Sequence, residues 1–365
     1  MAKIRDITNY LETIAPLSYQ ESYDNSGLLI GDSSAEVSGV LITLDCTEKV
    51  VMEAQEQKCN LIVAHHPILF KPLKKLIGSN YVERTLLKAI KNDIAIYAIH
   101  TNLDNVKHGV NHKISEKLGL TNCRILKPKA DALNKLITFV PPENTDEVLT
   151  ALGNAGAGQI GNYNDCSFRV QGTGTFRPNE LAQPHIGKAD QMEEVTEDRL
   201  EAIFPAYLAG RIVDALKQAH PYEEVAYYLQ PILNHNQEVG SGVTGLLPNE
   251  FESRDFLEYL KSAMQLDCIR HSEITSKKIR KVAVCGGAGS FLLPDALAMD
   301  CQAIISSDFK YHEFFDADNQ IVIADIGHYE SEVFTKDLIF ELLQEKFSNF
   351  ALHLSKVVTN PVRYY

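Results

Sequence analysis

Two neighbouring histidines have the clearest chemical potential in this chain. His65 and His66 follow a short apolar run at residues 61–64, and Pro67 stands directly after them. Neutral imidazole is a good ligand for zinc, iron, manganese and nickel. We therefore interpret the pair as candidate metal ligands. A pair of hydrogen-bonded structural histidines remains the alternative.

A histidine and a glutamate four residues apart form a second candidate. His328 and Glu332 follow another apolar run, at residues 321–324. If a helix begins near His328, both side chains lie on one face of it and can bind the same ion. An exposed first helical turn is the alternative, because acidic residues are favourable at a helix N-terminus.

A third apolar run, at residues 94–99, is followed by His100 and Asp104. A lone Asp in such a loop is usually a helix cap, and Asn105 could take the same role. The interpretation changes when all the strand ends are considered together, because three histidines and two carboxylates then map to one edge of a predicted sheet. These five candidate ligands are His65, His66, Asp104, His328 and Glu332.

The number and type of these side chains predict a two-metal site. A catalytic tetrahedral zinc takes three ligands from the protein, so five suit two ions that share a carboxylate. Nitrogen and oxygen ligands without sulfur favour zinc, iron or manganese over Cu(I) or an iron–sulfur cluster. We therefore expect two divalent metal ions per subunit, with zinc as the first choice and iron or manganese as alternatives.

Short apolar runs that end in polar residues predict the elements that position these side chains. Continuous apolar and β-branched runs between helical stretches are typical of strands buried on both faces. Ligands of such sheets bind at the carboxyl ends of the strands. We therefore predict an α/β core domain in two halves, with a largely parallel sheet. The predicted strands are residues 39–44, 61–64, 94–99, 281–284, 301–305 and 321–324.

A segment of different character separates the two halves. Its pattern predicts the order strand, helix, strand, strand, helix, strand, which is the ferredoxin-like plan of an α+β domain. Polar stretches with Gly and Pro, at residues 127–129 and 234–242, mark its edges. The predicted organisation is the first core half at residues 1–126, the inserted domain at 127–240 and the second core half at 241–365.

Composition and charge exclude several classes of protein. The 365 residues carry a formal net charge of −13, which argues against a general nucleic-acid partner, although a local basic stretch exists at residues 71–75. The seven cysteines form no CxxC motif and suit a reducing compartment. The sequence shows no signal-peptide pattern and no apolar run long enough to span a bilayer. We expect a cytoplasmic protein without a membrane partner.

Four motifs give the chain a family resemblance. They are DNSGLLIG at residues 24–31, HHP at 65–67, HTNLD at 100–104 and GHYESE at 327–332. In this order they resemble the NGG-one-interacting-factor-three-like family, whose bacterial members carry the name GTP cyclohydrolase one, type two homologue. The insert, with HPYEEVAY at residues 220–227, resembles the PII-like or CutA-like domain of the longer members.

The resemblance implies a dinuclear metal site and a ring-shaped homohexamer. The implied ligands are the same five residues, two from HHP, one from HTNLD and two from GHYESE. This sequence departs from the family at Tyr23, where Trp is frequent, and at residues 306–308, where Ser-Ser-Asp replaces Thr-Gly-Asp or Thr-Gly-Glu. These departures leave the ligand set intact and put a substrate role of the turn at 306–308 in doubt.

Neighbouring strand ends supply further candidates for proton transfer or for orienting the ligands. His100 is the first choice as catalytic residue. Metal-bound imidazoles need hydrogen-bond partners that fix their tautomer. Other candidates for these roles are Asp45, Asp308 and His312, and Asn25 could line the same cleft.

Three other patterns compete for a function. Residues 156–161 match GxGxxG, but they follow a predicted helix, so we reject a dinucleotide site. The CGGAGS turn at 285–290 could bind an anion, although a tight strand–helix turn needs the same glycines. His108 and His112 are interpreted as a solvated helix surface.

The predicted function is hydrolysis of a small phosphorylated or heterocyclic substrate by a metal-dependent enzyme. The GTP cyclohydrolase name fits this chemistry, since opening a purine ring begins with the addition of water. The alternative is a metal-binding regulatory or scaffold protein without turnover, with the insert as a sensor of a small effector.

Overall fold

The apolar runs of the first half form most of one sheet. The computed structural model describes residues 2–274 and 278–365. Strands β2 (Gly39–Thr43), β3 (Leu61–Ala64) and β4 (Ala95–Ala98) are parallel and completely buried. β1 (Gly27–Ile30) pairs antiparallel with β4, and β15 (Ala351–Leu354) pairs parallel with β2, which gives the order β1-β4-β3-β2-β15.

The runs of the second half form a separate sheet with the order β11-β14-β13-β12-β10-β5. Its three inner strands β12, β13 and β14 are parallel, while β5, β10 and β11 pair antiparallel with their neighbours. The strands are β5 (Thr121–Pro128), β10 (Gly240–Phe251), β11 (Arg270–His271), β12 (Ile279–Ala288), β13 (Ala303–Ser307) and β14 (Val322–Asp325).

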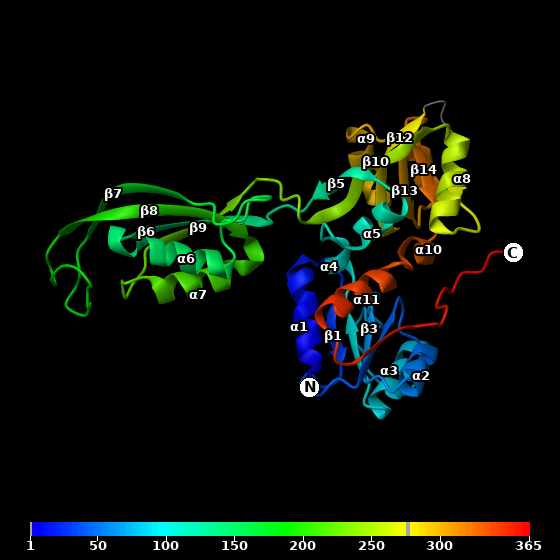
Figure 1. The fold of residues 1–365 in the computed structure, drawn as a ribbon, viewed down its shortest axis with the longest axis horizontal. Helices are drawn as coiled ribbons and strands as arrows, with labels where there is room; N and C mark the ends of the chain where they lie inside the picture. The colour runs from blue at the N-terminus through cyan, green and yellow to red at the C-terminus, as the bar shows by residue number, and fades with distance from the viewer. Residues whose placement is uncertain (1, 275–277) are drawn as a thin grey trace. The chain divides into compact units, whose positions relative to one another are not determined.

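The prediction of an α/β core in two halves is confirmed, but the polar strand ends belong to two sheets and not to one. The chain also crosses between the halves (Figure 1). β5 leaves the first half and joins the second sheet, and β15 returns from the second half to the first sheet. A single buried cluster includes side chains of both sheets, such as Val63 and Val284, so the two halves share one core.

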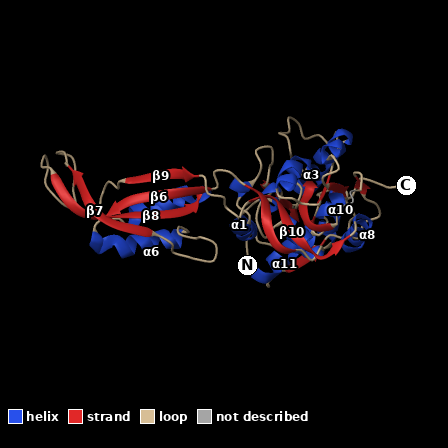
Figure 2. Cartoon of the chain, turned by 90° about the horizontal axis from the view of Figure 1, so that it is seen from above, coloured by secondary structure: helices blue, strands red, loops and turns tan. Residues whose placement is uncertain are grey.

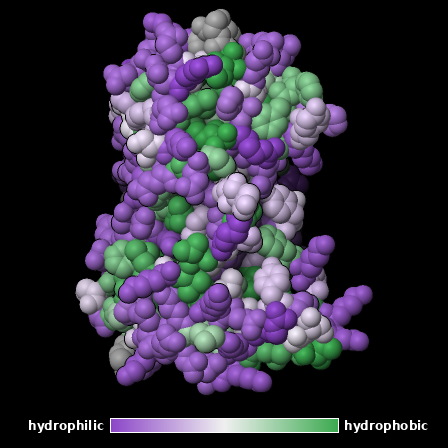
Figure 3. All heavy atoms as spheres, turned by 90° about the vertical axis from the view of Figure 1, so that its right-hand side faces the viewer, coloured by the Kyte–Doolittle hydropathy of each residue, from purple (hydrophilic) through white to green (hydrophobic). Residues whose placement is uncertain are grey.

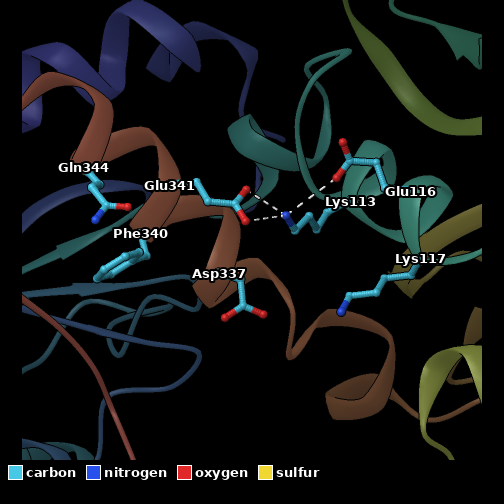
Figure 4. A pocket seen from close by; sticks show the side chains of 7 residues that line it. All are labelled: Lys113, Glu116, Lys117, Asp337, Phe340, Glu341 and Gln344. Atoms are coloured by element: carbon cyan, nitrogen blue, oxygen red, sulfur yellow. Dashed lines mark hydrogen bonds and ion pairs between the residues drawn. The ribbon is translucent and has the colours of Figure 1, made fainter.

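Two helices reinforce the connection between the halves. α5 (Val110–Lys117) packs on β10 and β12 of the second sheet, and α11 (Thr335–Lys346) packs on β2 and β15 of the first. Between them, Lys113 lies 2.7 Å from a carboxylate oxygen of Glu341 and 3.6 Å from one of Glu116 (Figure 4). The hollow beside these ion pairs has a volume of about 470 Å³.

The remaining helices surround the two sheets. α1 (Ile4–Ile14) buries Ile4, Ile7 and Leu11 at the helical spacing seen in the sequence. The others are α2 (Glu48–Glu56), α3 (Tyr81–Lys91), α4 (Thr101–Asp104), α8 (Ser253–Met264), α9 (Leu293–Ala298) and α10 (His328–Glu332).

The chain divides into two compact units, one formed by Met1–Pro128 with Gln237–Tyr365 and the other by Lys129–Asn236. In the second unit the elements follow one another as strand, helix, strand, strand, helix, strand, and the antiparallel sheet has the order β7-β8-β6-β9. Both helices lie on the same face of that sheet (Figure 1), as Figure 2 also shows for α6. The elements are β6 (Leu133–Val140), α6 (Thr145–Ala155), β7 (Phe168–Phe176), β8 (Glu193–Pro205), α7 (Ala209–Ala219) and β9 (Tyr227–Ile232).

No helix among the described residues has the length and apolar character needed to cross a membrane. Hydrophilic side chains cover much of the face drawn in Figure 3, with hydrophobic ones in separate groups. All seven cysteines are free thiols.

Candidate metal centre

The adjacent histidines lie at the carboxyl end of β3, as the sequence predicts. The backbone amide of His65 donates to Thr43 O, and that of His66 donates to Leu44 O, so the parallel pairing with β2 continues into the pair. His65 is fully buried, and its Nδ1 lies 2.8 Å from the carbonyl oxygen of Ile99. Because a carbonyl only accepts, Nδ1 carries the proton and Nε2 is the ring nitrogen with a free lone pair.

The second half contributes His328 and Glu332 from α10. Gly327 precedes this helix with φ of 88° and lets the chain turn directly from β14 into it. The two side chains lie on one face of the helix, with His328 Nε2 3.1 Å from Glu332 Oε2. Glu332 is only 2% exposed, so this carboxylate lies inside the protein.

Glu332 faces the candidate ligands of the first half with both of its oxygens. Oε2 lies 2.9 Å from His66 Nε2, and His66 Nε2 lies 3.3 Å from His328 Nε2. Oε1 lies 3.8 Å from His65 Nε2, which in turn lies 3.6 Å from Asp104 Oδ1. Two groups of donor atoms therefore share one carboxylate: His66, His328 and Glu332 form the first, and His65, Asp104 and Glu332 form the second.

Two buried atoms of this cluster have no hydrogen-bond partner among the described residues. They are His65 Nε2 and Asp104 Oδ1. Leaving such an atom unsatisfied costs roughly 1–3 kcal/mol. Burial also raises the pKa of Asp104 to about 6, against the opposing effect of His65. Imidazole nitrogen and carboxylate oxygen are ligands of zinc, iron and manganese, so the residues present fit a metal cation.

The carboxylates of the cluster favour positive charge on the neighbouring imidazoles. Burial alone lowers the pKa of His66, but hydrogen bonds to Asp45 and Glu332 outweigh it and raise this pKa to about 10. Burial also lowers the pKa of His328, but the neighbouring Glu332 and Asp308 outweigh this effect and raise the pKa to about 9. Burial would raise the pKa of Glu332, yet the close contacts with His328 and His66 and the nearby imidazole of His65 hold it well below its ordinary value. The cluster therefore stabilises positive charge at its centre.

Carboxylates orient two of the imidazoles. Asp45 Oδ1 accepts from His66 Nδ1 at 2.8 Å, and Asp308 Oδ2 accepts from His328 Nδ1 at 2.7 Å. Both bonds leave Nε2 of the imidazole directed at the cluster, which is the role that the sequence suggested for Asp45 and Asp308. His312, named as a candidate for the same role, instead lies exposed against the rings of Tyr311 and Phe315.

His100, the catalytic candidate, lies beside the cluster. Its ring centroid is 5.3 Å from those of both His65 and His66. Asp24 Oδ1 accepts from His100 Nδ1 at 2.8 Å, while Asp24 Oδ2 accepts from the backbone amide and hydroxyl of Thr101. Sequence analysis missed this role of Asp24, although the residue opens the DNSGLLIG motif.

The C-terminal segment also contacts the centre, a contact that no pattern in the sequence predicts. The hydroxyl of Thr359 donates to Asp45 Oδ2 at 2.5 Å, on the carboxylate that orients His66. One residue later, Asn360 Nδ2 donates to Glu330 Oε1 at 2.8 Å. Polar residues near the end of a chain carry no spacing signal, so only the structure reveals this contact.

The glycines of the CGGAGS turn have a structural role. Gly287 has φ of 63°, and a Cβ at this position would lie 2.4 Å from Glu332 Oε1. The amides of Gly286 and Gly287 already donate to Asn111 Oδ1 and Ser331 Oγ. The turn therefore makes room for the shared carboxylate instead of offering these amides to an anion.

The other side chains singled out from the sequence lie outside the cluster. The Asn25 side chain donates to Leu69 O at 2.7 Å and so fixes a loop. His108 and His112 contact each other, with ring centroids 5.0 Å apart. Gly156, first of the GxGxxG letters, has φ of 104° and ends α6, as expected for a helix C-terminus and not for a dinucleotide site.

Comparison with known proteins gives a consistent result over the whole chain. The profile of the Duf34/NIF3 (NGG1p interacting factor 3) family matches residues 2–361. A protein of Halalkalibacterium halodurans named GTP cyclohydrolase 1 type 2 homolog is 38% identical over 366 residues, which cover 99% of this chain and 98% of that one. A protein of the same name from Bacillus subtilis is 35% identical over 362 residues, covering 98% and 97%.

A solved structure is similar to this chain over its whole length. The Bacillus cereus protein related to NIF3 is 38% identical, has a TM-score of 0.86, and is matched over 99% of its length and 100% of this chain. The family resemblance of the four motifs is confirmed. The chain belongs to the Duf34/NIF3 (NGG1p interacting factor 3) family.

Proposed function

We propose that this protein is a hydrolase that uses two divalent metal ions per subunit, held by His65, His66, Asp104, His328 and Glu332. The observation that supports this most is the position of Glu332, a buried carboxylate whose two oxygens face two separate groups of donors. Zinc is the first choice for both sites, with iron or manganese as alternatives.

The proposed chemistry divides between the metal and the chain. Two ions bound by these residues would supply an activated water molecule and stabilisation of a leaving oxygen. Asp45 and Asp308 keep Nδ1 of His66 and His328 protonated, so that Nε2 is available as a ligand. His100 is proposed to move a proton at Nε2, since Asp24 holds its Nδ1.

The proposed substrate is a small phosphorylated or heterocyclic compound. The name of the curated relatives, GTP cyclohydrolase 1 type 2 homolog, is consistent with this chemistry. Opening a purine ring begins with the addition of water, which is the step that a metal-activated water would perform.

The test is turnover by the metal-loaded protein on a panel of nucleotides and phosphoesters. We expect His66→Ala to abolish turnover, because it removes one ligand from the group that contains Glu332 Oε2. His112→Ala, which removes an imidazole outside the cluster, should leave turnover unchanged. Equal slow turnover in both variants would indicate a contaminating enzyme and favour the alternative, a metal-binding regulator or scaffold.

We also propose that the protein assembles as a homohexamer, as the family resemblance implies, and that the insert folds as a separate domain. A location in the cytoplasm is proposed from the scattered cysteines, which suit a reducing compartment. Light scattering coupled to size-exclusion chromatography measures the assembly directly. A mass of one or two chains would contradict the hexamer.

A further inference from the structure

A basic loop follows the metal-ligand pair directly. Residues 68–77 connect the HHP motif to α3 and contain the sequence Lys-Pro-Leu-Lys-Lys at 71–75. Lys71, Lys74 and Lys75 are all exposed. Three of the five residues at 71–75 are therefore cationic, in a chain whose net charge is −13.

Contacts at both ends hold this loop beside the cluster. At its start, Leu69 O accepts from the Asn25 side chain at 2.7 Å, and the Phe70 ring packs edge-on against His100, with centroids 5.8 Å apart. At its end, Glu83 Oε2 accepts from the backbone amides of Ile77 at 3.0 Å and Ser79 at 2.9 Å. The lysines therefore lie on a short span between two fixed points, one of them in contact with the catalytic candidate.

The charges of the three ammonium groups are not balanced by carboxylates of the described residues. None of Lys71, Lys74 and Lys75 forms an ion pair with a described residue, in contrast to Lys113, which lies between two glutamates. An approaching anion would meet several carboxylates around the cluster, among them Asp45 and Asp308. Cations on the adjacent loop offset that repulsion at short range, within a Debye length of about 10 Å at 0.1 M salt.

We propose that loop 68–77 binds the phosphate group of a small phosphorylated substrate through Lys71, Lys74 and Lys75, next to the metal centre. This inference rests on the proposed hydrolase and selects the phosphorylated class among its substrates. Lysine ammonium is a common point-charge ligand of phosphate. A polyanion such as DNA would also meet the acidic remainder of the surface, so the charge balance favours a small ligand.

The test measures binding of inorganic phosphate to zinc-loaded protein by calorimetry, without any turnover. Lys71→Gln/Lys74→Gln/Lys75→Gln removes the three loop charges. Lys58→Gln/Lys88→Gln/Lys91→Gln is the matched control, with the same net charge. Lys58 and Lys91 stand just before β3 and β4, at the sheet edge opposite His65 and His100. Zinc content is measured in all three proteins.

We expect the loop variant to bind phosphate about tenfold more weakly, with unchanged zinc content, and the control variant to bind it like the wild type. Equal affinity in all three proteins, or an equal loss in both variants, would overturn the proposal. Two further arms use duplex DNA and vesicles of anionic phospholipid. If only the loop variant loses binding to DNA or to the vesicles while its affinity for phosphate is unchanged, the loop binds a macromolecule or a membrane and the proposal is wrong. Since no arm measures turnover, failure here leaves the hydrolase standing.

Discussion

His66 Nε2 lies 2.9 Å from Glu332 Oε2, although the two residues are 266 positions apart in the chain. His66 extends a strand of the first sheet, and Glu332 belongs to a helix that follows a strand of the second. The candidate metal centre is therefore built across the two halves of one structural unit, and folding of both halves must precede its formation.

The contact between Thr359 and Asp45 predicts that the C-terminal segment tunes metal affinity. Thr359→Val removes the hydroxyl that fixes Asp45, and Asp45 in turn orients His66. Partners of metal-bound histidines typically contribute 10–100-fold to affinity. We expect zinc affinity, measured by competition with a chelator, to fall about tenfold.

Thr359→Ser is the control for this effect, because it keeps the hydroxyl. The zinc affinity of Thr359→Ser should remain close to that of the wild type. The metal-free forms of Thr359→Ser and Thr359→Val should have the same melting temperature. If Thr359→Val and Thr359→Ser change zinc affinity equally, the hydroxyl does not act through Asp45.

Gly287→Ala is expected to damage the shared carboxylate. A Cβ there would lie 2.4 Å from Glu332 Oε1, and the φ of 63° disfavours any side chain. We expect a loss of roughly 1–3 kcal/mol in the free energy of unfolding, measured by urea denaturation, together with reduced zinc content. Gly172→Ala, at a position where a Cβ meets nothing within 4 Å, is the control. A fully stable, zinc-replete Gly287→Ala protein would contradict the position assigned to Glu332.

The hydrogen bonds of Asp24 predict that the stability of the protein depends on pH in the acidic range. Burial opposes ionisation, but hydrogen bonds from His100, Thr101 and Asn25 outweigh it and hold the pKa of Asp24 below its ordinary value. Its stabilising effect is therefore complete above the ordinary carboxyl pKa of about 4 and is lost as the pH falls through the lower folded value.

The measurement is the melting temperature of wild type and Asp24→Asn between roughly pH 6 and pH 3. The variant should be less stable at pH 6, and the gap between the two proteins should begin to narrow below about pH 4, because the lowered folded pKa keeps Asp24 partly ionised at pH 3. A gap of constant size would show that ionised Asp24 contributes nothing to this dependence.

His100→Ala separates proton transfer from metal binding. If His100 moves a proton, its removal should lower turnover by about 10²–10⁴-fold while both metal ions are retained. Metal content per chain and turnover are measured on the same preparation. Loss of metal in this variant would instead make His100 a ligand, consistent with its membership of a third donor group with His65 and His66.

Much of the centre could be predicted because strand ends leave a clear pattern. The apolar runs before His65, Asp104 and His328 are short and buried, and the residues after them are polar. The geometry of parallel sheets therefore predicts that His65 and Asp104 lie at the end of one sheet and that His328 lies at the end of the other. The spacing of His328 and Glu332 likewise fixes a common helix face.

The division into two sheets could not be predicted in the same way. Whether β5 and β15 pair within their own half or cross to the other depends on long-range contacts that local patterns do not encode. The roles of Asp24 and Thr359 were missed for a related reason: each acts through a hydrogen bond to a residue far away in the sequence, at 76 and 314 positions respectively.

Metal analysis of wild type and Glu332→Ala, with Glu116→Ala as a surface control, tests the central claim most directly. If Glu332 is shared by two ions, the wild type and the control should contain about two ions per chain, and Glu332→Ala should lose most of both. One ion or none in the wild type, or an unchanged content in Glu332→Ala, would contradict the shared-carboxylate centre.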